Sequence, residues 1–184
     1  RQGNNWVKDD EDNLIQARGE LVKLQNGDPE NLDLWQKIKD ISMDSFLSIY
    51  EMLGVQFDHS LGESFYRDKV ELIYEQLLAH KICEENDGAL VVFHPDHKRF
   101  SKQPFIIRKS DGASNYATTD LATVAFRKNE WQSNQIIYVT DGRQRDHFEQ
   151  LFMTVQKWFS AEKNACPLLK HVWFGTILGD DNKA

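Results

Sequence analysis

Apolar side chains recur at a helical period in the first third of the chain. The stretch from Leu14 to Leu24 is a helix candidate that Asn26-Gly27 ends, and Asp28-Pro29 then begins a second helix, with Asp as its cap and Pro in its first turn. The apolar residues of this second helix keep near-helical spacing before Gly54; they are Leu34, Trp35, Ile38, Phe46, Ile49, Tyr50 and Leu53. This spacing predicts a buried helix face. Residues 1–13 are polar and acidic apart from Trp6, which indicates a loop or a frayed end.

Residues 55–110 combine short strands with one helix. Val55-Gln56-Phe57-Asp58 alternates like a short strand, and the turn Gly62-Glu63-Ser64 leads into a helix. The buried stripe of that helix is predicted to comprise Val70, Ile73, Tyr74, Leu77 and Leu78. Asn86-Asp87-Gly88 signals a turn before a strand over 89–93, and residues 104–108 form its partner. The pattern predicts an antiparallel hairpin with a long loop over residues 85–110.

Helix and strand patterns alternate after residue 113. Ser114 or Asn115 can cap a helix that the chain enters at Thr119. The continuous apolar run 135–140 predicts a strand covered on both faces, a helix with an apolar stripe follows, and a buried strand over 171–174 ends at Gly175. This order is typical of half of a doubly wound α/β sheet, in which ligands bind beyond the carboxyl ends of the strands. Residues 140–144 and 175–178 lie at those ends.

Tyr116 and Asp120 are the first candidates for a binding site. They are four residues apart and share a helix face if the helix begins early enough. A phenol beside a carboxylate suits a planar cation, and a guanidinium suits it best because a carboxylate accepts its forked donors in pairs. The alternative is that Asp120 complements the helix dipole and Tyr116 is half-buried.

Composition indicates a globular protein. Of 184 residues, 40% are apolar and 28% are charged, and no apolar run approaches the ~20 residues of a membrane span. No signal peptide opens the chain, and Cys83 and Cys166 lack motif spacing, so we expect a reduced, cytoplasmic protein without membrane contact. The net charge of −7 is concentrated in residues 1–63, which hold 13 acids and 6 bases. Overall acidity argues against binding nucleic acid through bulk charge.

The loop of the predicted hairpin holds two further candidates. His94 and His97 could suggest a metal, but Pro95 argues against a helix and no second ligand pair is near, so we expect a solvated loop and no bound metal. A basic cluster interleaved with Phe100 and Phe105 comprises Lys98, Arg99, Lys102, Arg108 and Lys109. This cluster either keeps an exposed hairpin soluble or contacts a nucleic acid strand.

Five blocks of sequence resemble, in the same order, the catalytic domain of the arginyl-tRNA synthetases, which are class I aminoacyl-tRNA synthetases. The blocks are Val22-Lys23-Leu24-Gln25-Asn26-Gly27-Asp28, Gly62-Glu63-Ser64-Phe65-Tyr66, Tyr116-Ala117-Thr118-Thr119-Asp120-Leu121-Ala122, residues 138–147 and Phe174-Gly175-Thr176-Ile177-Leu178-Gly179. The likeness runs from about Ala17 to the C-terminus. It implies an α/β fold: the second half of a Rossmann-like nucleotide-binding fold over residues 113–184, preceded over residues 1–112 by a helical segment and an α+β connective insertion with the antiparallel hairpin.

The resemblance also implies site residues and substrates. Tyr116 and Asp120 would hold the guanidinium of L-arginine, Gln144 would hold the backbone end of the amino acid, and His147 and Gly175 would lie near the nucleotide. The family activates arginine with ATP, with Mg²⁺ accompanying the nucleotide, and transfers it to the 3′ end of tRNA(Arg). The basic loop would then meet the acceptor strand of the tRNA.

The sequence departs from the family pattern at two places. It contains nothing like the family's His-x-Gly-His signature, and it ends before a Lys-Met-Ser-Lys-like loop should follow. We therefore expect an internal fragment of an arginine–tRNA ligase that is inactive alone and holds no catalytic residue of its own. The alternatives are a non-catalytic arginine- or RNA-binding module derived from that fold and a structural partner without a ligand.

Overall fold

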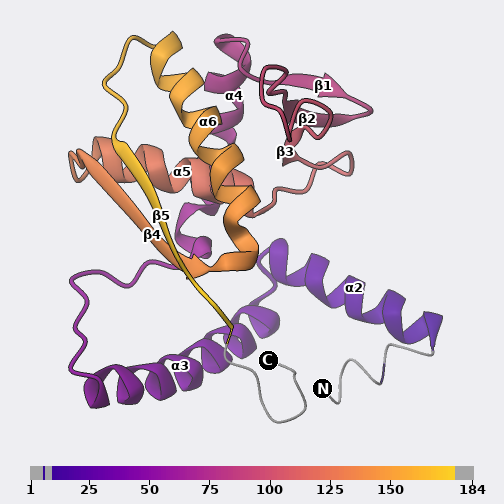
Figure 1. Cartoon of the computed structure of the whole chain (residues 1–184). Helices are drawn as coiled ribbons and strands as arrows, with labels where there is room; N and C mark the ends of the chain where they lie inside the picture. The colour runs from indigo at the N-terminus through magenta and orange to yellow at the C-terminus, as the bar shows by residue number, and fades with distance from the viewer. Residues whose placement is uncertain (1–5, 7–9, 177–184) are drawn as a thin grey trace. The chain divides into compact units, whose positions relative to one another are not determined.

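The structure is a computed structural model that describes Trp6 and residues 10–176 (Figure 1). Its contacts divide the chain into two units, with the boundary after Ser60. The boundary predicted between residues 112 and 113 divides the connective insertion from the nucleotide-binding fold. It is a functional boundary and not a division by contacts, and it stays a prediction.

The described residues 10–60 of the first unit form helices α2 (Glu11–Gln25) and α3 (Pro29–Met52). Asp28 caps α3 by accepting a hydrogen bond from the backbone N–H of Asn31, and Pro29 occupies the first turn, as predicted. Helix α2 begins three residues before the predicted Leu14, because Asp10 accepts from two backbone N–H groups at the helix start. The loop prediction is therefore wrong for residues 11–13.

The apolar face of α3 is not buried within this unit. No residue of α3 is buried, and Leu34 and Ile38 are 56% and 58% exposed. The predicted buried face is wrong here because, among the described residues of this unit, no element covers that face. Residues 55–58 are not a strand; instead the ring of Phe57 meets that of Tyr50 edge-on, with the centroids 4.8 Å apart.

The second unit contains a three-stranded antiparallel sheet in the order β1 (Glu84–Asn86), β2 (Ala89–Val92) and β3 (Phe105–Arg108). Asp87 and Gly88 both have positive φ angles, 49° and 80°, which a two-residue type I′ hairpin turn requires. The predicted hairpin is confirmed, but β1 was not foreseen. All three of its residues are polar and exposed, so only pairing with β2 defines the strand.

The loop between β2 and β3 is solvated in part only. His94 and Phe100 are buried, whereas Pro95 and Lys98 are exposed. Burial lowers the pKa of His94 to about 4, and its Nε2 lies 3.2 Å from the hydroxyl of Thr154. The expectation of a solvated loop is thus wrong for His94, which belongs to the packed interior.

The aromatic residues of the basic cluster also face the interior. Phe100 and Phe105 are 0% and 4% exposed. Arg99 pairs with Asp146, and the guanidinium of Arg108 lies over the ring of Tyr74. Neither phenylalanine is therefore placed to stack on the bases of a nucleic acid.

The core of the second unit forms around η1 (Glu63–Lys69), α4 (Val70–Ala79) and α5 (Tyr116–Asn129). Helix α4 buries four of the five predicted residues; Leu78 is 44% exposed. Buried polar groups join α5 to its neighbours, because the hydroxyl of Thr118 donates to the Ile107 carbonyl and that of Tyr74 donates to Thr118. These bonds fix α5 against β3 and α4.

A second sheet consists of two parallel strands, β4 (Gln135–Asp141) and β5 (Leu168–Phe174), which η2 (Gly142–Gln144) and α6 (Arg145–Ala161) connect (Figure 1). Ile136 and Tyr138 face the core that α5 and α6 build, whereas Ile137 and Val139 are 48% and 64% exposed. The predictions that β4 is covered on both faces and that β5 is buried are wrong, because these helices cover one face only. The chain is a mixed α/β structure with small sheets.

Among the described residues, no helix combines the length and the apolar character that crossing a bilayer requires.

The start of α5 provides a first test of the fold. Asn115 caps α5 by accepting from the N–H groups of Ala117 and Thr118, and its amide donates to the Ile106 carbonyl at 2.8 Å. We expect Asn115→Ala to lower the free energy of unfolding by roughly 1–3 kcal/mol, for the cap and the second bond together. Asn115→Ser keeps a capping oxygen and should lose about half as much. Urea unfolding followed by circular dichroism measures both, and equal losses would contradict the capping role.

His94 provides a second test, through pH. Because its pKa is about 4 in the folded chain and near 6.5 when exposed, the unfolded state binds more protons between these values. Stability should therefore fall as the pH falls from about 7 to about 4. His94→Gln should lack the part of this fall in stability that protonation of His94 causes. Urea midpoints at pH 7, 6 and 5 for the two proteins measure the difference, and parallel curves would refute a neutral, buried His94.

Candidate functional site

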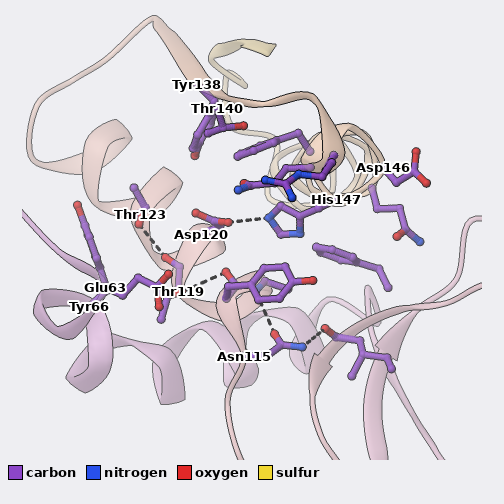
Figure 2. Close-up of a pocket in the computed structure, with 18 of the residues that line it drawn as sticks. Glu63, Tyr66, Asn115, Thr119, Asp120, Thr123, Tyr138, Thr140, Asp146 and His147 are labelled. Atoms are coloured by element: carbon purple, nitrogen blue, oxygen red, sulfur yellow. Dashed lines mark hydrogen bonds and ion pairs between the residues drawn. The ribbon is translucent and has the colours of Figure 1, made fainter. Parts of the chain in front are cut away.

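A cavity of about 840 Å³ opens in the second unit between η1, α5, the end of β4 and the start of α6 (Figure 2). Polar and aromatic side chains from these elements line it. They include Tyr66, Phe105, Asn115, Tyr116, Asp120, Thr123, Arg127, Tyr138, Thr140, Arg143, Gln144, Asp146 and His147.

Helix α5 presents one face to the cavity. Because Asn115 rather than Ser114 is its cap, the helix begins at Tyr116, three residues before the predicted Thr119. Tyr116 and Asp120 therefore lie one turn apart on the same face, and both line the cavity. The helix thus begins early enough for Tyr116 and Asp120 to share a face, as the sequence analysis required.

The carboxylate of Asp120 meets the imidazole of His147. Figure 2 shows the two side chains pointing toward one another, with His147 Nε2 2.6 Å from Asp120 Oδ2. The other carboxylate oxygen, Oδ1, has no hydrogen-bond partner among the described residues. The ring of Tyr116 stands edge-on to the imidazole at 4.7 Å and is 59% exposed, and its hydroxyl has no partner in the described part of the chain.

Gln144 lies at the end of η2, directly after β4. Its side chain is exposed and makes no hydrogen bond to any described residue. The preceding turn is fixed by Asp141, whose carboxylate accepts from the side chain and backbone of Arg143 and from the hydroxyl of Thr176. These bonds, the Arg143 side chain first, hold the pKa of Asp141 far below its usual range. Asp141 thus joins the carboxyl ends of β4 and β5.

Gly142 allows the turn after β4 to approach β5 closely. A Cβ at this position would lie 3.2 Å from the indole of Trp173, so a larger residue would push the turn away from β5.

Three of the lining residues that the sequence analysis missed share one feature. Tyr66, Arg127 and Tyr138 each hold a buried polar atom without a hydrogen-bond partner among the described residues, namely the two hydroxyls and the Arg127 Nε. The Arg127 guanidinium lies 5.5 Å from the centre of the Tyr138 ring. Burial raises the pKa of Tyr138 above its usual range. A signal for Arg127 was present, since it follows Tyr116 by eleven residues and Asp120 by seven, which places all three on one helix face.

The structure thus brings together four of the predicted site residues, Tyr116, Asp120, Gln144 and His147. Gly175 follows β5 and does not line the cavity. The described residues contain no cluster of three His, Cys, Asp or Glu side chains that could hold a metal ion. The roles assigned to the five residues stay predictions.

Comparisons with known proteins give one consistent result. The family model described as tRNA synthetases class I (R), catalytic domain, matches residues 1–184. The chain is 43% identical over 164 residues to an arginine–tRNA ligase of Rhodopirellula baltica, covering 89% of this chain and 23% of that protein. It is 40% identical over 169 residues to the cytoplasmic arginine–tRNA ligase of Arabidopsis thaliana, covering 91% and 28%.

A solved structure agrees. The arginyl-tRNA synthetase of Plasmodium falciparum superposes with a TM-score of 0.76 at 30% identity, over 91% of this chain and 29% of that one. The chain therefore spans about a quarter of the length of these relatives. Since the family model covers the whole chain, the chain belongs to the catalytic-domain family of the class I arginyl-tRNA synthetases.

Proposed function

We propose that the cavity beside α5 binds L-arginine as part of an arginine–tRNA ligase, with Asp120 and Tyr116 receiving the guanidinium. The observation that carries this proposal is that Asp120 Oδ1 and the Tyr116 hydroxyl, on residues one helical turn apart that line the cavity, have no hydrogen-bond partner among the described residues. A carboxylate has about four acceptor sites, and His147 uses one, so a forked cation can still pair with the remaining ones.

The same geometry favours arginine over lysine. A guanidinium is planar and presents parallel N–H donors, whereas an ammonium is a compact point charge without a preferred plane. A site with paired acceptors therefore binds the two parallel N–H donors of a guanidinium more tightly. When an ammonium binds, one acceptor is left unsatisfied.

The other site residues complete the proposal. Gln144, whose amide has no hydrogen-bond partner among the described residues, lies at the carboxyl end of β4 and orients the amino or carboxylate end of the substrate. The family resemblance assigns His147 and Gly175 to the nucleotide side of the site. ATP, with Mg²⁺, and tRNA(Arg) are the co-substrates of the reaction, in which the arginine carboxylate attacks the α-phosphate and the arginyl group then passes to the terminal ribose. The chain's part in this reaction is to position arginine.

The proposed fold assignment rests on the two sheets. The parallel pair β4–β5 with α6 between its strands supports the second half of a nucleotide-binding fold over residues 113–184. The antiparallel sheet β1-β2-β3 supports a connective insertion within residues 1–112.

Asp120→Asn tests the arginine site. In the full-length protein this change should weaken arginine binding by roughly 2–3 kcal/mol, because one charge-assisted pair is lost, and leave the melting temperature nearly unchanged. Isothermal titration calorimetry measures the affinity. Glu149→Gln is a matched control, since Glu149 also lies beside a histidine, His97, but outside the cavity. Equal arginine affinity in Asp120→Asn and the parent would refute the assignment.

The 184-residue chain alone should not activate arginine. Activation in the family holds ATP from two sides, by the His-x-Gly-His element and the Lys-Met-Ser-Lys-like loop, and these 184 residues contain neither motif. Losing even one such donor typically costs ~10²–10³ in rate. ATP–pyrophosphate exchange with arginine and tRNA(Arg) present should match a blank without protein. Exchange above the blank that Asp120→Asn abolishes would show a complete active site within this chain.

A further inference from the structure

The imidazole of His147 occupies a closed setting beside Asp120. Three aromatic rings surround it: Tyr116 at 4.7 Å, Phe148 at 5.0 Å and Phe105 at 5.6 Å between centroids. The side chain of His147 is 10% exposed, and that of Asp120 is 27% exposed. Phe105 and Phe148 are buried, so the imidazole has little room to turn away from the carboxylate on their side.

We infer that His147 is a positioning residue that fixes the carboxylate plane of Asp120 and thereby makes the cavity select a guanidinium over an ammonium. This inference rests on the arginine site proposed above. It assigns to the amino acid end of the cavity a residue that the resemblance places near the nucleotide.

The hydrogen bond at 2.6 Å supplies the constraint. Nε2 must carry a hydrogen to donate to Oδ2, and it does so in the Nε2–H tautomer as well as in the doubly protonated ring. The side chain of Asp120 has no other hydrogen-bond partner among the described residues. Without His147, no hydrogen bond to a described residue would fix the plane of the Asp120 carboxylate.

Rotation would affect the two cations differently. A bidentate pair forms only when the carboxylate and the guanidinium share a plane, so a rotating carboxylate loses part of that pairing. An ammonium binds a carboxylate from many directions and depends much less on the plane. Loss of the constraint should therefore weaken arginine binding more than lysine binding.

The residue changes that separate these effects are His147→Phe and His147→Gln. Phenylalanine keeps the ring among its aromatic neighbours and removes the donor. Glutamine keeps an N–H donor close to the position of Nε2. A merely structural role would be preserved better by Phe, whereas a positioning role would be preserved better by Gln.

The experiment measures the affinities of the full-length protein for L-arginine, for L-lysine as a competitor of arginine, and for ATP. We expect His147→Phe to weaken arginine roughly tenfold or more, lysine by less than about threefold, and ATP not at all, since a charge-assisted hydrogen bond is lost at one end of the cavity. His147→Gln should recover most of the arginine affinity. Near-ultraviolet circular dichroism checks that each variant is folded.

Three outcomes would overturn the inference. Weaker ATP binding with unchanged arginine binding would assign His147 to the nucleotide, and equal weakening of arginine and lysine would indicate a structural role. If His147→Phe does not fold, weak arginine binding by a folded His147→Gln would also refute it. Asp120→Asn measured in parallel separates the two claims. Unchanged arginine affinity in Asp120→Asn refutes the arginine site itself. Weaker arginine binding in Asp120→Asn, with unchanged binding in His147→Phe, refutes only the role of His147.

Discussion

The site depends on where helix α5 begins. Asn115 bonds the first N–H groups of the helix with its side-chain oxygen and the Ile106 carbonyl of β3 with its amide, so one side chain fixes the helix start against the sheet. Thr118, bonded to Ile107, repeats the link one turn later. A helix begun at Thr119 would have left Tyr116 outside the regular face. The beginning at Tyr116 sets the phase that brings Asp120 and Arg127 to the cavity.

Local signals predicted much of the fold. The cap Asp28 with Pro29 and the turn Asp87-Gly88 act within a few residues, so the sequence shows them directly. Burial could not be predicted in the same way, because it depends on what covers an element. Ile137 and Val139 have the pattern of a strand buried on both faces, but α5 and α6 cover only the opposite face. Strand β1 was missed for a related reason, since its polar residues form a strand only by pairing with β2.

The site likewise combines features that local sequence predicts with features that depend on packing between elements. The spacing of Tyr116 and Asp120 is a helix-surface property, and it was predictable once the helix start was known. The contact between Asp120 and His147 joins two helices across 27 residues and needs the packing of α6 against α5. No spacing in the sequence predicts that contact. The unpaired polar atoms of Tyr66, Arg127 and Tyr138 likewise become visible only when η1, α5 and β4 meet.

The position of Asp120 argues against one of its two sequence interpretations, the helix-dipole role. A carboxylate that complements a helix dipole acts within the first turn, and the first turn of α5 contains no acidic residue, because Asp120 lies one turn beyond the start. Tyr116 is also more exposed than a half-buried residue would be, at 59%. Asp120 is instead removed from most solvent, bonded through one oxygen and open at the other. The Asp120 side chain therefore keeps one acceptor oxygen on the cavity side that a ligand cation can reach, and this supports the proposed cation-binding role.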